Sequence, residues 1–155
     1  GVSKSPSMPK PKRRWTPSRP RGNTIAPDMA IIISRGIRDK EFGSAIPEEA
    51  REILQRTARV ALATPLASRG LPPGTRLLKV YATSARGPRR VVYLLAVEAT
   101  DLFLLFYRDK SDAVGANVSP KNPAFTKQLK KHLALLHEDI KTNQVDVIEV
   151  KDQSA

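Results

Sequence analysis

The stretch RLLKVYATSARGPRRVVYLLAVEATDLFLLFYRDK, residues 76–110, decides the fold because it reads as three consecutive β-strands. β-Branched, leucine and aromatic residues concentrate in three segments, which are residues 76–82, 90–97 and 102–108. Gly87-Pro88 and a short polar segment separate them, and connections of this length join neighbouring antiparallel strands. The sequence therefore predicts a three-stranded meander whose last two strands lie centrally, since they are apolar on both faces.

Two helices are predicted, one before and one after the meander. Pro47 followed by two glutamates is typical of a first helical turn, and this helix should run to about Ala63. The second helix should begin at Asn122-Pro123, an N-cap residue followed by proline at the first helical position. Apolar residues recur along it at three- and four-residue spacing: Leu129, Leu133, Leu136 and Ile140. Each helix therefore has one side for packing.

A further strand is predicted at each end of this region. Residues 31–33 are three isoleucines, and the polar residues 34–36 should end that strand. Residues 145–150 alternate in character and are a possible final strand, whose partner cannot be read from the sequence. We expect an α+β fold in which a small twisted antiparallel β-sheet packs with helices. The folded domain should cover residues 29–141, and residues 142–155 should be a C-terminal tail with that possible extra strand.

Residues 1–28 differ in composition from the rest of the chain. Before Asp28 they carry only basic charges, which make up more than half of the net charge of +12. Their six prolines disfavour a helix or an inner strand, so we expect a disordered basic tail. They contain no apolar core of a secretory signal. Such a tail can bind polyanions through counterion release, or it can be a solvated leader.

The composition excludes several classes of site. The 155 residues contain no cysteine and two histidines, which excludes a disulfide framework, an iron–sulfur cluster, a cysteine nucleophile and a structural zinc site. There is no run of eighteen apolar residues, so we expect neither a transmembrane segment nor a membrane partner. A glycine-rich phosphate loop and a hydrolase triad have no support in the sequence, and we expect no metal and no cofactor.

The two histidines, His132 and His137, do not form a joint site. Five residues apart on one helix, they are rotated by roughly 140° from each other. His132 stands beside Lys130 and Lys131, which predicts a surface position for its side chain.

Basic residues cluster in the first half of the meander. Six of them lie between residues 69 and 90 without an acidic residue: Arg69, Arg76, Lys79, Arg86, Arg89 and Arg90. Such a patch prefers phosphate, and Tyr107 can join it because an antiparallel meander brings the end of the third strand near the start of the second. Tyrosine beside arginine suits stacking on a base and contact with its phosphate. The expected RNA contacts are Arg76, Arg86, Arg89, Lys127, Lys130 and Lys131. The alternative is a solvated basic rim.

RNA cleavage needs few protein groups, because the 2′-hydroxyl of RNA is an internal nucleophile. Lys79 and Tyr107 are candidates for proton transfer. Arg90, together with Arg89 or Lys110, is a candidate for stabilising negative charge on the phosphate. This chemistry does not require a metal ion.

Three segments in this order resemble the RelE/ParE superfamily of bacterial toxins. They are Arg76-Leu77-Leu78-Lys79-Val80, Arg90-Val91-Val92-Tyr93 and Leu104-Leu105-Phe106-Tyr107-Arg108-Asp109-Lys110. They look like the family's basic second strand, its Arg-x-x-Tyr strand and its Leu-Leu-x-x-Tyr-x-Lys ending. The resemblance covers about residues 29–141, and it implies the small α+β fold expected above.

The RelE and HigB branches imply a toxin of a type II toxin–antitoxin system, a metal-independent endoribonuclease that cleaves mRNA in the ribosomal aminoacyl site. In this reading Arg90 matches the phosphate-stabilising arginine, Lys79 a basic residue of the active strand, and Arg108 or Lys110 the later catalytic cation. Residues 111–125 lack the tyrosine that some members carry, which leaves Tyr107 as its substitute. The implied partners are mRNA on the ribosome, with rRNA contacts, and a cognate antitoxin, all in the cytoplasm.

Two other functions stay open on the sequence. The ParE branch shares the scaffold but is implied to poison DNA gyrase, so the fold alone does not fix the function. A non-catalytic RNA-binding or ribosome-associated protein also fits the basic tail and the absence of a strong base. A nuclease and a binder differ in whether the cations converge around one concave site.

Overall fold

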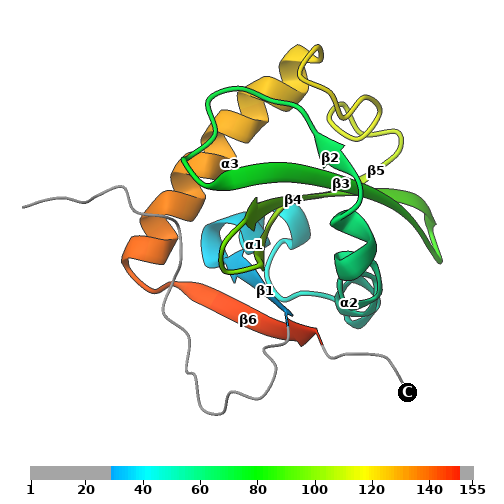
Figure 1. Ribbon diagram of the computed structural model, residues 1–155. Helices are drawn as coiled ribbons and strands as arrows, with labels where there is room; N and C mark the ends of the chain where they lie inside the picture. The colour runs from blue at the N-terminus through cyan, green and yellow to red at the C-terminus, as the bar shows by residue number, and fades with distance from the viewer. Residues whose placement is uncertain (1–28, 151–155) are drawn as a thin grey trace, which may run out of the picture.

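The predicted meander is present and forms the middle of the sheet (Figure 1). Its strands are β3 (Thr75–Ser84), β4 (Gly87–Ala96) and β5 (Asp101–Asp109), and each pairs antiparallel with the next. A computed structural model describes residues 29–150, so the predicted basic tail and the last five residues lie outside the described residues. Gly87 has a φ of 118°, a conformation that favours glycine, and it closes the β3–β4 turn opposite Ser84.

The first and the last described strands lie side by side. β1 (Met29–Ser34) pairs parallel with β5 and antiparallel with β6 (Val145–Val150), in the sheet order β2-β3-β4-β5-β1-β6. The strand expected at residues 145–150 is therefore confirmed, and β1 is its partner. The sheet is antiparallel apart from the β1–β5 pair, and the α+β class is as expected. β2 (Pro65–Leu66), which the sequence did not indicate, forms the opposite edge beside β3.

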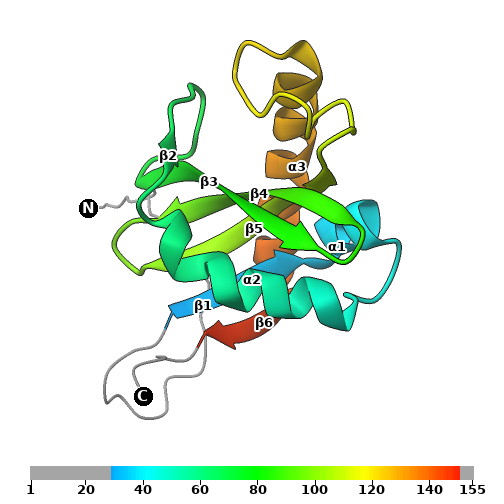
Figure 2. The same ribbon diagram turned by 90° about the vertical axis from the view of Figure 1, so that its right-hand side faces the viewer.

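Helices cover both sides of the sheet (Figure 2). α2 (Glu48–Ala61) lies on one side, and α3 (Pro123–Lys141) lies on the other. Both were predicted, although α2 ends two residues earlier than expected. α1 (Arg35–Phe42) was not predicted: Ser34, expected to end the first strand, caps it by accepting a hydrogen bond at Oγ from the Ile37 N–H, at 3.2 Å. None of the described helices is long and apolar enough to cross a bilayer.

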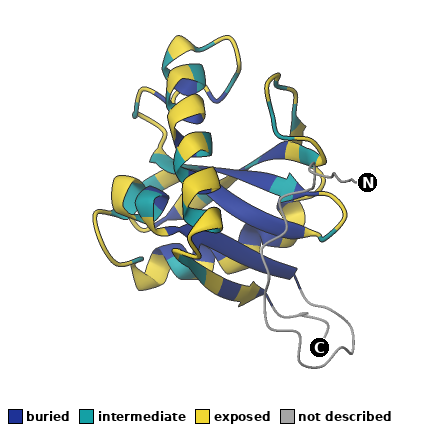
Figure 3. Cartoon of the chain, turned by 90° about the vertical axis from the view of Figure 1, so that its left-hand side faces the viewer, coloured by how far each residue is buried: buried dark blue, intermediate teal, exposed yellow. Residues whose placement is uncertain are grey.

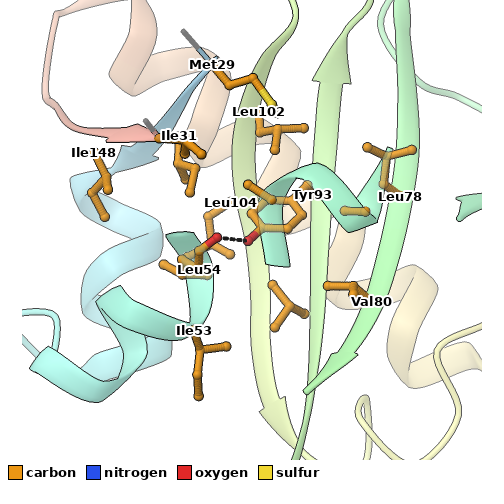
Figure 4. Close-up of a cluster of buried hydrophobic side chains, with 14 of the residues drawn as sticks. Met29, Ile31, Ile53, Leu54, Leu78, Val80, Tyr93, Leu102, Leu104 and Ile148 are labelled. Carbon is orange, nitrogen blue, oxygen red and sulfur yellow. Dashed lines mark hydrogen bonds between the residues drawn. The ribbon is translucent and has the colours of Figure 1, made fainter. Parts of the chain in front are cut away.

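Two apolar layers hold the sheet between its helices. On the α2 side the buried Tyr93 ring packs among leucines and isoleucines, and its hydroxyl donates to the Leu54 carbonyl at 3.2 Å (Figure 4). On the α3 side Phe103, Phe106 and Phe125 are fully buried or nearly so. Figure 3 shows the central strands buried along most of their length, while the outer side of α3 is exposed. The middle of the meander is thus covered on both sides, as its apolar sequence predicted.

Candidate nucleic-acid interface

Strand alternation and register place four residues on one side of the sheet. Lys79 and Tyr81 are two residues apart on β3 and therefore share a side. Tyr81 pairs with Arg90 of β4, and Arg90 pairs with Arg108 of β5, so these three form a row across the strands. We call the set Lys79, Tyr81, Arg90 and Arg108 the basic face. It lies on the α3 side, the side to which Phe106 also belongs.

Tyr81 is the centre of the basic face. The residue is 56% exposed to solvent, and two cations lie near its ring. The Arg90 guanidinium lies 4.2 Å from the ring centroid, and the Lys79 ammonium lies 5.7 Å from it. Cation–π attraction at these distances contributes about 0.5–1 kcal/mol at an exposed site. The ring and both cations are therefore held together at the surface, where a nucleobase and its phosphate can reach them.

Arg108 occupies the buried end of the row. Its Nε and Nη2 donate to the two carboxylate oxygens of Glu41 at 2.8 Å each, and its Nη1 donates to Asp112 at 2.9 Å. Its side chain is 19% exposed. Like charges directly opposite on neighbouring strands repel, and the carboxylate of Glu41 offsets this repulsion between Arg108 and Arg90. Arg108 is thus fixed in place, but most of its donors are already engaged.

Glu41 joins α1, α3 and β5. Its side chain is fully buried, and it accepts hydrogen bonds from the Tyr107 N–H at 2.9 Å and from His132 Nε2 at 2.8 Å, besides those from Arg108. Burial raises the pKa of this carboxyl, but the hydrogen bonds from His132, Arg108 and the Tyr107 backbone outweigh it, so the pKa lies below its usual value. Glu41 is therefore ionised and holds the inner end of the basic face.

The surface position predicted for His132 is wrong. The side chain is 1% exposed, stacks on Phe106 with the ring centroids 4.7 Å apart, and contacts Glu41 through Nε2. Successive helix positions are rotated by about 100°, so Lys130 and Lys131 can be exposed while the residue that follows them points into the core. Among the described residues, Nδ1 of His132 has no hydrogen-bond partner. The His132 ring is therefore part of the packed interior, and it is too buried to contact a ligand bound on the basic face.

Tyr107 and Arg89 lie on the other side of the sheet. Tyr107 packs against Phe42 with centroids 5.2 Å apart, and the Arg89 guanidinium lies 5.9 Å from the Tyr107 ring. Arg89 also pairs with Asp109 at 3.6 Å. Burial raises the pKa of Tyr107 in spite of the nearby Arg89. Tyr107 therefore lies beside a cation, as expected, and this cation is Arg89. Lys79 and Arg90 lie on the opposite side of the sheet.

The other predicted cations are exposed and dispersed. They are Arg76 on the α2 side of β3, Arg86 in the β3–β4 turn, Lys110 after β5, and Lys127, Lys130 and Lys131 on α3.

Beyond Lys110 the chain returns close to the end of β5: a Cβ at Gly115 would lie 2.0 Å from the Asp109 carbonyl oxygen. Glycine is required there, because a side chain at this position would clash with the backbone at the end of β5.

Two residues of the candidate site, the exposed Tyr81 and the buried Glu41, are not predicted from the sequence. Tyr81 could have been found, because a two-residue turn that pairs Ser84 with Gly87 also pairs Tyr81 with Arg90. Glu41 gave no local signal, since its partners come from distant elements. Comparison with family models, with curated proteins and with solved structures finds no match to this chain. The resemblance to the RelE/ParE superfamily thus rests on the three sequence segments alone.

Proposed function

We propose that this protein binds RNA on the basic face and cleaves mRNA on the ribosome as a toxin of a toxin–antitoxin system. The observation that carries the proposal is the exposed Tyr81 ring flanked by Lys79 and Arg90. Aromatic rings stack on unpaired bases, and adjacent cations bind the phosphates that follow, which is how proteins commonly take single-stranded RNA. The RelE and HigB branches of the resemblance suggest the cleavage, the ribosome, the antitoxin and the cytoplasm.

The proposed reaction uses the RNA's own nucleophile. The 2′-hydroxyl gives up its proton to solvent water and attacks the adjacent phosphorus. The bond to the 5′-oxygen breaks, a 2′,3′-cyclic phosphate forms, and the leaving 5′-oxygen takes up a proton. Arg90 is the group suited to the negative charge that develops on the phosphate, because a guanidinium stays protonated and presents several donors. Lys79, whose ammonium lies 5.7 Å from the Tyr81 ring centroid, is the candidate for proton transfer.

A non-catalytic RNA-binding protein is the second candidate, and Arg108 is the observation that favours it. The donors of Arg108 are directed at Glu41 and Asp112. The third cation of the row is therefore largely neutralised, which leaves Lys79 and Arg90 to meet the phosphate. This pair suffices for binding, whereas cleavage also needs one of them to move a proton.

A brief induction in bacteria, followed by transcriptome-wide mapping of new RNA 5′ ends, tests the proposal. The variants are Arg90→Ala and, as a matched control, Arg51→Ala, which removes the same charge from α2 on the opposite side of the sheet. We expect new ends inside translated reading frames with wild type and Arg51→Ala, and none with Arg90→Ala. Growth arrest without new ends would favour a gyrase poison. Normal growth without new ends would favour the RNA binder.

A further inference from the structure

A groove lies between residues 67–70, which follow β2, and the first half of α3. Its volume is about 630 Å³, within the usual range of small-molecule sites. The apolar side chains of Leu129 and Leu133 line one wall, and the cations Arg69 and Lys130 stand beside them. The described lining contains no acidic residue. An apolar wall with two cations suits a flat apolar group that carries a negative charge.

The groove also has polar atoms for a neutral ring to contact. Ser68 and Thr126 line it, and each hydroxyl donates locally, to the carbonyls of Arg69 at 3.5 Å and of Pro123 at 3.2 Å. A hydroxyl that donates once keeps two acceptor lone pairs. A nucleobase has N–H donors that match such acceptors, whereas a simple aliphatic anion has none. The polar atoms therefore favour a nucleotide as the occupant.

The groove adjoins the basic face. Leu66, which comes just before the groove loop, pairs with Leu77 of β3. Leu77 is two residues from Lys79 on the same side of that strand, which corresponds to about 7 Å along it. Leu66, Leu77 and the groove residue Leu133 belong to one apolar cluster on the α3 side. A strand of RNA that crosses Tyr81 and Lys79 along β3 is thus led towards Arg69.

We propose that this groove binds a second nucleotide of the RNA strand that stacks on Tyr81. The base lies against Leu129 and Leu133, and the phosphate contacts Arg69 and Lys130. The proposal rests on the proposed function, because it takes the same RNA as ligand, and it adds a second point of attachment. RNA held at both points lies across β3 in a fixed direction, so the phosphate presented to Arg90 is selected by position.

Two neighbouring lysines of α3 provide the test. Both are exposed and both are among the RNA contacts expected from the sequence, but only Lys130 lines the groove. Lys130→Glu and Lys131→Glu change the net charge of the full chain by the same amount, so non-specific attraction to RNA falls equally in both. The measurement is the affinity for a fluorescent twelve-nucleotide oligouridylate at one salt concentration. We expect Lys130→Glu to bind at least tenfold more weakly than Lys131→Glu, and equal affinities would overturn the groove proposal.

Cross-linking identifies the second contact directly. Oligouridylate containing 4-thiouridine is irradiated with the wild-type chain, and the modified peptides are found by mass spectrometry. We expect cross-links within residues 67–70 or α3 as well as at Tyr81.

Cross-links confined to β3 and β4 would overturn the groove proposal and leave RNA binding by the basic face intact. If binding persists in Arg90→Ala and is lost in Lys130→Glu, the basic face fails while the groove stands. Wild type that binds no RNA would overturn both.

Discussion

Arg89 and Arg90 are neighbours on β4, yet they belong to two different environments. Arg89 faces the α2 side, where it is 16% exposed at the side chain, paired with Asp109 and set beside Tyr107. Arg90 faces the α3 side, where it lies over the exposed Tyr81 ring and makes no ion pair with a described residue. On the α2 side the arginine is paired with a carboxylate, whereas on the α3 side the arginine has no carboxylate partner among the described residues. Charge in the sequence is therefore a poor guide to binding until each residue's side of the strand is known.

The largest expected effect concerns the inner end of the basic face. Glu41→Ala removes the only carboxylate that contacts the buried His132 among the described residues, and it leaves Arg108 with Asp112 alone. Removing one partner of a buried ion pair costs about 3–5 kcal/mol. We expect a loss of this size in the free energy of unfolding, measured by urea denaturation. Asp146→Ala, which breaks exposed pairs with Arg35 and Arg38, is the control and should cost about 1 kcal/mol or less. Similar losses in both would contradict the structural role of Glu41.

The next effect separates the two arginines. Arg90→Ala should lower RNA cleavage by roughly 100-fold, the usual loss when a preorganised donor to a transition state is removed. Arg89→Ala should leave the rate within a few-fold of wild type, because this side chain faces away from the basic face. The measurement is single-turnover cleavage of mRNA on isolated ribosomes. Equal losses in both variants would show that the side of the strand does not matter.

The pH dependence of stability provides a finer test of Glu41. Its pKa in the folded protein lies below the usual value of about 4.5, so the stabilisation from the ionised carboxylate is present above that usual value. It is lost as the pH falls through the lowered pKa. We expect the difference in unfolding free energy between wild type and Glu41→Gln to be constant near pH 7 and to shrink below about pH 4.5. A difference that grows on acidification would contradict this sign.

The smallest effect lies within the apolar layer on the α2 side. Tyr93→Phe removes a hydroxyl that donates to the Leu54 carbonyl and contacts Thr57 at 3.2 Å. A single buried hydrogen bond contributes about 0.5–1.5 kcal/mol, and thermal unfolding should show a loss of that size. RNA affinity should not change, because Tyr93 is fully buried and its ring lies on the side opposite Tyr81. A change in affinity would mean that the two sides are coupled.

The elements with strong local patterns could be predicted from the sequence. The meander, α2, α3 and β6 each have a periodic apolar pattern or a capping residue, and these patterns depend on near neighbours only. α1 has eight residues of which Ile37 alone is buried, so it shows no apolar stripe. β2 has only two residues, and it forms by pairing with the edge of β3 rather than from a pattern of its own. The parallel β1–β5 pair joins segments about seventy residues apart, which no local pattern encodes.

The candidate site divides in the same way. Lys79 and Arg90 were identified from charge, and the hairpin register that unites them with Tyr81 is a local property. The buried position of His132 depends on Glu41, which α1 presents to α3 from ninety-one residues away. The two lysines that precede His132 in the sequence, Lys130 and Lys131, are exposed and do not indicate that His132 contacts Glu41. Long-range partners therefore decide which cations stay available, and the sequence pattern does not contain them.

The pairing of β1 with β6 has a consequence for the order of synthesis. β1 is made first among the described strands, but one of its two edges stays unpaired until the last strand has left the ribosome. Its isoleucines are buried on both faces in the finished protein, and an apolar strand with a free edge invites pairing with other chains. Contacts between such distant segments also slow folding. A chain released before residue 145 would thus be prone to aggregate, so a premature stop there removes more than a terminal strand.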